Sequence, residues 1–569
     1  MKIMKKYIAK HLFRLTLMLT FGLTISCSDM LDTVPQGQFT AEQLDDSSVE
    51  GLLASAYAGL EAHFYGNNEA FAGPSTNWIF DVRSDDAYKG GGGTGMEENI
   101  HLLEVSEVNS DNVSCLNKWQ NNYYAISRVH NAMLAVQQAG SIGNAAELMG
   151  ELKTLRAWYY FDLIRIFKRI PYFTEDEDVN TKPNDEYSRD EIFSFIRRDL
   201  TEAIDVLPSQ KSDKGRITRT TAQAILAKVC AQTGDWEGVK RYADAVISSG
   251  LYSLYPNFGD LSKIDHNNGS ESIFALQCST ANDNAHINWS NLLNCTYSDG
   301  NLYGTGDDFF YGSQNLVNAF RTDANGLPLL DGSFNDVNVD ANYMGTVDPR
   351  LDFTVGRIGM PWRGHTYTEG WCRAYDVYGE YSNKKAWPAP EDALASWPWG
   401  CSSLNFMFIR YADILLLKAE ALVETAAGSN AATDVDLVEA RRLVNMVRQR
   451  AVDTMNDGAY LPQDLDPFTA DYNVALYPTE GDGNLAWTKE RARMAVRFER
   501  RLELALEGQR WFDLVRWGDD YLVSTMNRYM TEEAAIRPYY QGRSVSANEI
   551  FLPVPLDEID NSNGLYKQY

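Results

Sequence analysis

Apolar residues recur at helical spacing through two long blocks of the chain, and this spacing is lost between them. In residues 41–62, for example, Val49, Leu53, Ala56 and Leu60 lie three or four positions apart, as on one face of a helix. The same pattern predicts further helices at 119–139, 145–167, 189–206, 218–233, 236–248, 408–425, 435–450 and 489–517. The sequence therefore predicts a mainly α-helical protein.

Residues 222–247 have the pattern of two antiparallel helices joined by a tight turn. Small residues such as Ala227 follow one face of the first helix, Gly234 interrupts the pattern, and Val246 lies on the apolar face of the second helix. This hairpin resembles a tetratricopeptide unit, and several units in succession would form a right-handed superhelix. A single isolated helical hairpin would give the same local pattern.

Residues 279–403 lack the helical period and are rich in Gly, Asn, Asp, Pro and aromatic side chains, which favours a large irregular insertion of loops and short strands. We therefore expect four parts. These are a signal peptide at 1–26, an N-terminal helical part at 27–278, the insertion at 279–403, and a C-terminal helical part at 404–569. The two helical parts are expected to pack into one tetratricopeptide-like body.

The N-terminus has the features of an export signal. Residues 1–14 carry five positive charges, and the apolar run at 15–25 is too short to span a bilayer. The run ends in Ser26-Cys27, and a small residue before cysteine at this point resembles a bacterial lipobox. We expect removal of residues 1–26 and acylation of Cys27, although ordinary secretory cleavage beside an incidental cysteine is the alternative.

The strongly negative net charge argues against some classes of binding partner. Hydrophobic residues make up 44% and charged residues 23% of the 569-residue chain, as in ordinary globular proteins. The formal net charge is −27, and loss of the five positive charges in residues 1–26 makes it −32. Because no cluster of Lys and Arg offsets this charge, nucleic-acid binding is not expected.

Cysteine and histidine spacing offers no metal or cofactor site. The cysteines form no CxxC pair, and the seven histidines form no HExxH motif. We expect mostly unpaired thiols, with Cys230 a small core residue on a helix. The Asp/Asn-rich stretch 331–340 could supply calcium ligands, but turn formation is the preferred interpretation.

Several sequence blocks along the mature chain share one family pattern. They are Cys27–Asp32 (CSDMLD), Asp81–Asp86 (DVRSDD), Leu155–Leu163 (LRAWYYFDL), Gly215–Thr218 (GRIT), Asp348–Leu351 (DPRL), Ile409–Leu416 (IRYADILL), Glu499–Gly508 (ERRLELALEG), Arg510–Gly518 (RWFDLVRWG) and Phe551–Pro555 (FLPVP). In this order the blocks resemble the SusD/RagB family of nutrient-uptake lipoproteins of Bacteroidetes. Arg156, Arg410, Glu499 and Arg516 are predicted to lie in apolar helices, where an unpaired charge would be costly, so we expect buried arginine–carboxylate pairs between helices.

The resemblance implies a cell-surface lipoprotein anchored in the outer membrane that binds oligosaccharide. It also implies a partner, a SusC-like TonB-dependent transporter, and binding without catalysis. A relative that captures peptides is one alternative. A glycoside hydrolase is a second, because such enzymes need only two suitably placed carboxyl groups.

Enzyme motifs give little support to a catalytic function. Gly90–Gly95 satisfies GxGxxG, but it follows the polar residues 83–86 rather than a buried strand, so nucleotide binding is not expected. The adjacent pairs Asp85-Asp86, Glu97-Glu98 and Asp307-Asp308 are candidate carboxylates. With 78 acidic residues in the chain, such pairs are expected by chance.

A sugar-binding site needs an aromatic platform for the apolar face of the ring and charged or amide groups for its hydroxyls. Residues 279–403 contain six of the thirteen tryptophans, at positions 289, 362, 371, 387, 397 and 399. The resemblance implies a site where loops of the early helices meet the insertion. The candidate ligand-binding residues are Asn67, Asn68, Glu69, Glu97, Tyr303, Asp307, Phe309, Tyr311, Trp362, Trp371, Arg373 and Tyr375.

Overall fold

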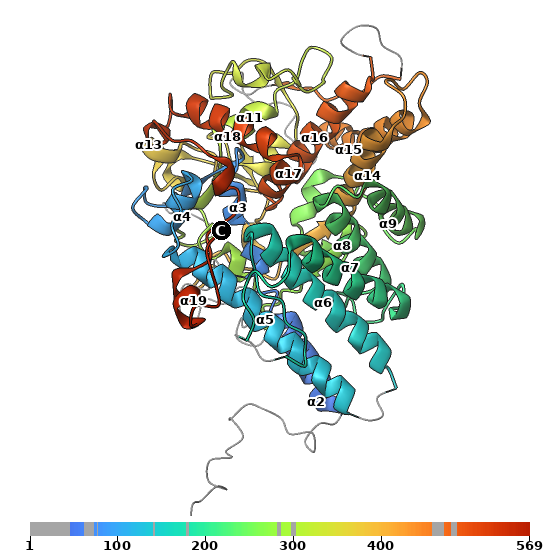
Figure 1. The fold of residues 1–569 in the computed structure, drawn as a ribbon. Coiled ribbons are helices and arrows are strands. Elements are labelled where there is room, and N and C mark those ends of the chain that lie inside the picture. The colour runs from blue at the N-terminus through green and yellow to red at the C-terminus, as the bar shows by residue number, and fades with distance from the viewer. Residues whose placement is uncertain are drawn as a thin grey trace, which may run out of the picture.

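The protein is seen in a computed structural model as a stack of helices with a loop-rich insertion packed along one side (Figure 1). The structure describes residues 46–61, 73–76, 78–139, 143–177, 181–281, 286–297, 303–457, 471–479 and 486–569. Cys27 and the sequence-predicted residues Asn67, Asn68 and Glu69 lie outside the described residues.

The first half of the chain forms a run of helices, each packed against the next. They are α2 (Asp46–Ala58), α5 (Val113–Gln138), α6 (Ala145–Ile166), α7 (Arg189–Val206), α8 (Arg219–Gln232) and α9 (Trp236–Ser248). The predicted bounds of the last four are right to within one residue. Helix α5 begins six residues earlier than predicted, because the Asn112 side chain accepts hydrogen bonds from the amides of Ser114 and Cys115 and caps the helix.

The second helical part continues the same stack after the insertion. It contributes α14 (Tyr411–Thr425), α15 (Val435–Asn456) and α16 (Lys489–Leu504), and α14 packs directly against α9 and α8 (Figure 1). Trp158 on α6 is buried against Phe274 and Phe408, which lie on paired strands before and after the insertion. The tetratricopeptide-like helical fold predicted from the sequence is confirmed.

The predicted helix at 489–517 is broken into α16 and α17 (Arg510–Arg516). Leu506 and Gly508 between them have φ angles of 58° and 73°, in the left-handed region that ends a helix. The carbonyl of Glu503 at the end of α16 accepts hydrogen bonds from the side chains of Lys385 and Arg410. The break therefore depends on contacts from distant segments, which helical periodicity does not reveal.

Six short helices, the 15-residue helix α18 and short strands complete the described body. The helices are α3 (Trp78–Val82), α4 (Glu98–Glu104), α11 (Gln314–Ala319), α12 (Leu351–Thr354), α13 (Tyr375–Tyr378), α18 (Asp519–Glu533) and α19 (Leu556–Asn561). The strands are β1 (Ala87–Gly90), β2 (Ser272–Leu276), β3 (Phe309–Gly312), β4 (Thr346–Val347), β5 (Pro361–Trp362), β6 (His365–Thr366), β7 (Phe406–Arg410) and β8 (Asp471–Tyr472). Short strands in loops are what the sequence predicted for the insertion.

Strand β1 pairs antiparallel with β3 and so joins the early chain to the insertion. This corrects one expectation, since the glycine-rich stretch 90–95 does follow a buried strand. Because β1 is antiparallel to its neighbour, the stretch is still not part of a parallel dinucleotide-binding unit. Instead, the pairing brings the glycine-rich loop beside the insertion.

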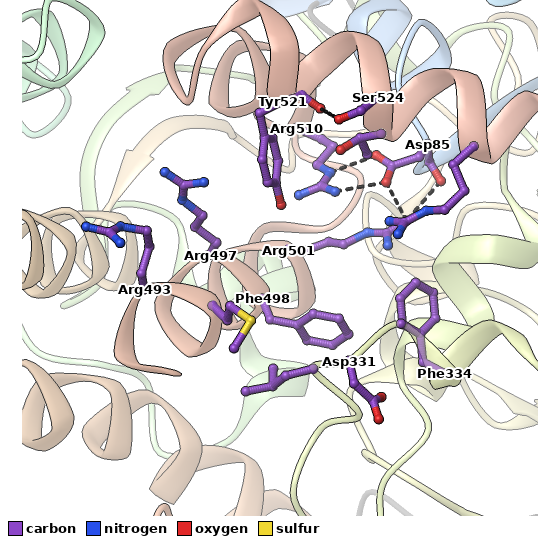
Figure 2. Close-up of a pocket in the computed structure, with 15 residues that line it drawn as sticks. Asp85, Asp331, Phe334, Arg493, Arg497, Phe498, Arg501, Arg510, Tyr521 and Ser524 are labelled. Atoms are coloured by element: carbon purple, nitrogen blue, oxygen red, sulfur yellow. Dashed lines mark hydrogen bonds and ion pairs between the residues drawn. The ribbon is translucent and has the colours of Figure 1, made fainter. Parts of the chain in front are cut away.

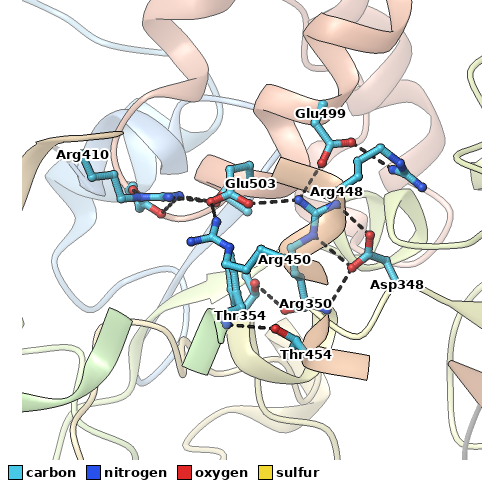
Figure 3. A network of polar contacts seen from close by, with 12 residues as sticks. Asp348, Arg350, Thr354, Arg410, Arg448, Arg450, Thr454, Glu499 and Glu503 are labelled. Atoms are coloured by element: carbon cyan, nitrogen blue, oxygen red, sulfur yellow. Dashed lines mark hydrogen bonds and ion pairs between the residues drawn. The ribbon is translucent and has the colours of Figure 1, made fainter. Parts of the chain in front are cut away.

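Buried arginine–carboxylate pairs connect the segments, as predicted. Arg156 forms two hydrogen bonds of 2.7 and 2.9 Å to Asp199, and Arg516 forms two of 2.7 and 2.6 Å to Glu420. Arg410 and Glu499 belong to a larger network, which we call the central network (Figure 3). Arg410 ends strand β7 and occupies the N-cap position of α14, so its predicted place within a helix is corrected. Its members are Glu271, Asp348, Arg350, Lys385, Arg410, Arg448, Arg450, Glu499, Glu503 and Glu507.

Six cysteines lie in the described part of the chain, and all are free thiols. Cys230 is buried on α8, as predicted. Among the described residues, no helix combines the length and the apolarity needed to cross a bilayer.

Candidate functional site

Five of the sequence-predicted aromatic candidates are buried and present no ring to solvent. Tyr303, Trp362 and Trp371 belong to the insertion core, a cluster completed by Cys295, Tyr367, Cys372 and Trp387. Phe309 and Tyr311 are on β3 and lie in the main core. The prediction that these five rings form a sugar-stacking surface does not fit their burial, because stacking requires an exposed face.

The physical reason is visible in the insertion core. Trp362 stacks on Tyr367 at a centroid distance of 5.2 Å, and its indole N–H donates to the Tyr303 hydroxyl at 3.1 Å. The Tyr303 hydroxyl in turn donates to the carbonyl of Pro388. A loop-rich insertion has little regular structure to bury apolar surface, so its aromatic side chains supply the core.

The structure brings Asp307, Arg373 and Tyr375 to an exposed patch, which we call the arginine patch. Arg373 forms an ion pair with Asp307, and its guanidinium lies 5.3 Å from the centre of the Tyr297 ring. Tyr297 and Tyr375 are 36% and 40% exposed. A charged hydrogen-bonding pair therefore lies beside the accessible Tyr297 ring, and Tyr375 follows Arg373 by two residues at the start of α13.

The glycine-rich loop borders the arginine patch. A Cβ atom added to Gly92 would lie 3.2 Å from Nε of Arg373, so the loop backbone passes close to the guanidinium. Lys89 donates to the carbonyls of Gly93 and Met96 and so holds the loop closed. Burial lowers the pKa of Lys89 to about 8, and the partly exposed Glu97 carboxylate opposes that shift.

A buried carboxyl group supports the patch from below. Asp308 accepts hydrogen bonds from the amide of Arg373 at 3.0 Å, from the Ser382 hydroxyl at 2.8 Å and from the Tyr311 hydroxyl. Burial raises the pKa of Asp308 to about 7. Asp308 thus fixes the backbone at Arg373, whereas its neighbour Asp307 reaches the surface.

A second exposed aromatic group, which we call the tryptophan patch, consists of Trp397 and Trp399. Their rings meet edge to face at a centroid distance of 5.2 Å, and Trp397 is 45% exposed. Neither was selected from the sequence. The turn-forming context Ser396-Trp397-Pro398-Trp399-Gly400 is the signal that could have identified them.

Both patches rest on the insertion core. The amide of Tyr297 donates to the carbonyl of Trp371 at 3.0 Å. A Cβ atom added to Gly400, which follows Trp399, would lie 2.6 Å from the Trp387 ring, so the backbone beside the tryptophan patch packs against that residue. The insertion core therefore supports the backbone at both patches.

Three of the candidate catalytic carboxylates, Asp85, Asp86 and Asp307, are paired with arginines. Asp85 accepts two hydrogen bonds from Arg510, at 2.7 and 2.8 Å, and Asp86 accepts one from Arg501 at 2.7 Å. Asp307 is paired with Arg373. These pairings hold the chain together. The remaining candidate pair, Glu97-Glu98, lies at the start of α4, where Glu97 is partly exposed and Glu98 is exposed.

The Asp/Asn-rich stretch 331–340 contains turns. Asp331 accepts hydrogen bonds from the amide and hydroxyl of Ser333, and Asp340 accepts one from the amide of Asn342. Within the described ranges, no group of three or more His, Cys, Asp or Glu side chains is arranged to hold a metal ion.

Comparison with known proteins identifies the family. The family model described as the SusD family matches residues 270–569, more than half of the chain. The protein belongs to the SusD family. A second family model, described as starch-binding and associating with the outer membrane, matches residues 31–230.

Relatives match this SusD-family protein over different shares of its length. SusD-like protein P25 from Formosa agariphila is 23% identical over 94% of this chain and 94% of its own. A SusD-like protein from Bacteroides ovatus is 28% identical over 45% of this chain and 47% of its own.

Solved structures share the fold. Surface glycan-binding protein A from Bacteroides thetaiotaomicron, solved with laminarihexaose, superposes with a TM-score of 0.65 at 19% identity, over 92% of this chain and 99% of that one. A SusD superfamily protein from Bacteroides vulgatus gives a TM-score of 0.69 at 20% identity, over 92% and 98%. A laminarin-binding SusD-like protein gives 0.62 at 22% identity, over 92% and 99%.

Proposed function

We propose that this protein is a cell-surface lipoprotein that captures oligosaccharide and passes it to a partner TonB-dependent outer-membrane transporter. The observation that carries the proposal is the combination of exposed rings and charged groups on the insertion. In the arginine patch, Tyr297 and Tyr375 accompany the Arg373–Asp307 pair. In the tryptophan patch, the Trp397 side chain is 45% exposed and lies beside Trp399.

Sugars match such surfaces for a physical reason. The C–H groups on one side of a pyranose ring pack against an aromatic face, while the hydroxyls at its edge accept from a guanidinium and donate to a carboxylate. Rings held by a rigid core lose little conformational entropy on binding, which favours affinity. Because two structural relatives are described with laminarihexaose or laminarin, a β-glucan oligosaccharide is the first ligand to test.

The lipid anchor and the transporter partner are further parts of the proposal. The lipobox-like Ser26-Cys27 after an apolar run supports acylation of Cys27. The family model that matches residues 31–230 is described as associating with the outer membrane, which supports that location. Co-purification of the tagged protein with a TonB-dependent transporter from detergent-solubilised outer membranes tests the partnership.

Binding is tested by calorimetry with laminarihexaose and a panel of other neutral oligosaccharides. We expect binding without release of shorter sugars. Trp397→Ala should weaken binding by about 1–3 kcal/mol, the range for losing one exposed aromatic contact. Tyr124→Ala is the matched control, because Tyr124 is exposed on α5 outside the insertion.

Other outcomes separate the alternatives. Hydrolysis of the oligosaccharide would support a glycoside hydrolase. Binding of peptides with no binding of any glycan in the panel would support a peptide-capturing relative. Equal affinity of the wild-type protein and Trp397→Ala for the sugar would exclude the tryptophan patch from the binding site.

A further inference from the structure

Figure 2 shows an arginine-lined pocket, which shares no lining residue with the arginine patch or the tryptophan patch. Its volume is about 470 Å³, within the range of small-molecule sites. Helix α16, helix α18, the start of α17 and the loop at 330–334 form its walls. Five arginines line it: Arg493, Arg497, Arg501, Arg510 and Arg528.

Two of these arginines, Arg501 and Arg510, are neutralised by buried carboxylates and form a rigid wall of the pocket. Arg510 binds Asp85 through two hydrogen bonds, and Arg501 binds Asp86 at 2.7 Å and the Asn315 side chain at 2.9 Å. All four charged side chains are buried. These pairs connect distant parts of the chain, so their role is structural.

The other three arginines of the pocket, Arg493, Arg497 and Arg528, differ in their ion pairing. Arg493 forms two hydrogen bonds with Glu424, of 2.6 and 2.8 Å. Arg497 has its nearest carboxylate oxygen, also on Glu424, 3.9 Å away, and its buried Nε has no hydrogen-bond partner. Arg528 is exposed and makes no ion pair with any residue that the structure describes. Two guanidinium groups are thus left with free N–H donors.

One acidic side chain of the pocket wall, that of Asp331, partly offsets the positive charge of Arg497 and Arg528. Asp331 already accepts hydrogen bonds from the amide and the hydroxyl of Ser333, and these bonds lower its pKa. The five arginines outnumber the four carboxylates beside them, which are Asp85, Asp86, Asp331 and Glu424. The pocket therefore keeps an excess of positive charge in a protein whose net charge is −27. An anionic ligand fits this excess, because a guanidinium binds a planar oxyanion through two parallel N–H donors.

The remaining lining suits a sugar. The Tyr521 ring lies 4.9 Å from the Arg497 guanidinium and is partly exposed, and Ser524 adds a hydroxyl. Figure 2 shows Tyr521 between Arg510 and Arg497, with Phe498 below them. An aromatic face, a hydroxyl and free cationic donors together match a saccharide that carries a negative group.

We propose that this pocket binds an oligosaccharide bearing an oxyanion, either a uronate carboxylate or a sulfate ester, through Arg497 and Arg528. The sugar part of this inference rests on the proposed glycan capture, whereas the anion part rests on the pocket alone. The pocket is a second site, so a neutral glycan at the insertion and an acidic glycan here would bind independently.

The test uses the whole mature protein and calorimetry with trigalacturonate, a sulfated galactose tetrasaccharide, and fully methyl-esterified trigalacturonate as the neutral match. We expect at least one acidic sugar to bind more than tenfold more tightly than the neutral match, with affinity that falls as NaCl is raised. Arg528→Gln, an exposed change, should weaken this binding at least tenfold. Arg497→Lys, which keeps the charge but loses the fork of donors, should weaken it as well.

Arg442→Gln is the control, since Arg442 is an exposed arginine on α15 paired with Glu439 away from the pocket. Melting temperatures of all variants identify any loss of fold. Failure of both acidic sugars to bind, or equal binding by Arg528→Gln, would overturn the proposal. So would inorganic sulfate or a glutamate-rich peptide that binds as tightly as the sugars, because the site would then recognise a bare anion or an acidic protein.

The same measurements separate this inference from the proposed function. Laminarihexaose binding that depends on Trp397, without any acidic-sugar binding, would refute the pocket and keep glycan capture. Acidic-sugar binding that depends on Arg528, without neutral-glycan binding, would support the pocket and refute capture of neutral glycan at the insertion.

Discussion

Replacing Glu503 by glutamine tests whether the central network stabilises the fold through balanced buried charge. Glu503 accepts from Arg350 at 3.0 Å and is also paired with Arg410 and Arg450 (Figure 3). Its side chain is fully buried. Burial alone would raise the pKa of Glu503, but these three guanidinium groups outweigh burial and hold it below its ordinary value.

The magnitude follows from the charges that remain. The network contains five cations and five carboxylates, so loss of one carboxylate charge leaves one uncompensated positive charge in the interior. Removing one partner from a buried pair costs about 3–5 kcal/mol. With an unfolding entropy of about 2.1 cal/mol/K per residue over a body of this size, such a loss lowers Tm by about 3–4 °C.

Differential scanning calorimetry at pH 7 measures the effect on Glu503→Gln. The matched control is Glu439→Gln, which removes a partly exposed partner of the exposed Arg442 and should cost less than about 1 kcal/mol. A fall in Tm no larger for Glu503→Gln than for the control would refute the reasoning, because the buried charge would then be dispensable.

Three more outcomes are expected. Trp371→Ala should lower stability by about 3–5 kcal/mol as a core substitution does, and an unchanged Tm would contradict its assignment to the insertion core. Because burial raises the pKa of Asp308 to about 7, the folded protein keeps a proton that the unfolded chain has lost, so this group's contribution to stability falls as pH rises from about 4 through 7. Asp308→Asn removes that dependence, and its Tm relative to wild type should therefore rise between pH 5 and pH 8; a constant difference would argue against the raised pKa. Cys27→Ala protein should neither incorporate radiolabelled palmitate nor remain with the membrane fraction, and continued labelling would disprove acylation at Cys27.

The sequence did not reveal which aromatic rings of the insertion are exposed and which are buried. Trp371 and Trp397 both lie in polar, loop-forming contexts, yet one is buried in the insertion core and the other is exposed. In a segment without helical or strand periodicity, neighbouring positions do not alternate between core and solvent in a readable way. The arginine patch was found in part, since Asp307, Arg373 and Tyr375 were candidates, whereas Tyr297 and the tryptophan patch were not.

The sequence by itself determined the helical stack, because each helix carries its own apolar face at a spacing of three to four residues, with caps such as Ser188 before α7. It also determined that apolar-context arginines such as Arg410 must meet carboxylates, since an unpaired buried charge is too costly. Which carboxylates they meet was decided only in the tertiary structure, where Glu271 and Glu507 reach Arg410 from different segments. The arginine-lined pocket arises in the same way, because Arg497 and Arg528 lie on separate helices and acquire a common function only when α16 and α18 pack around one cavity.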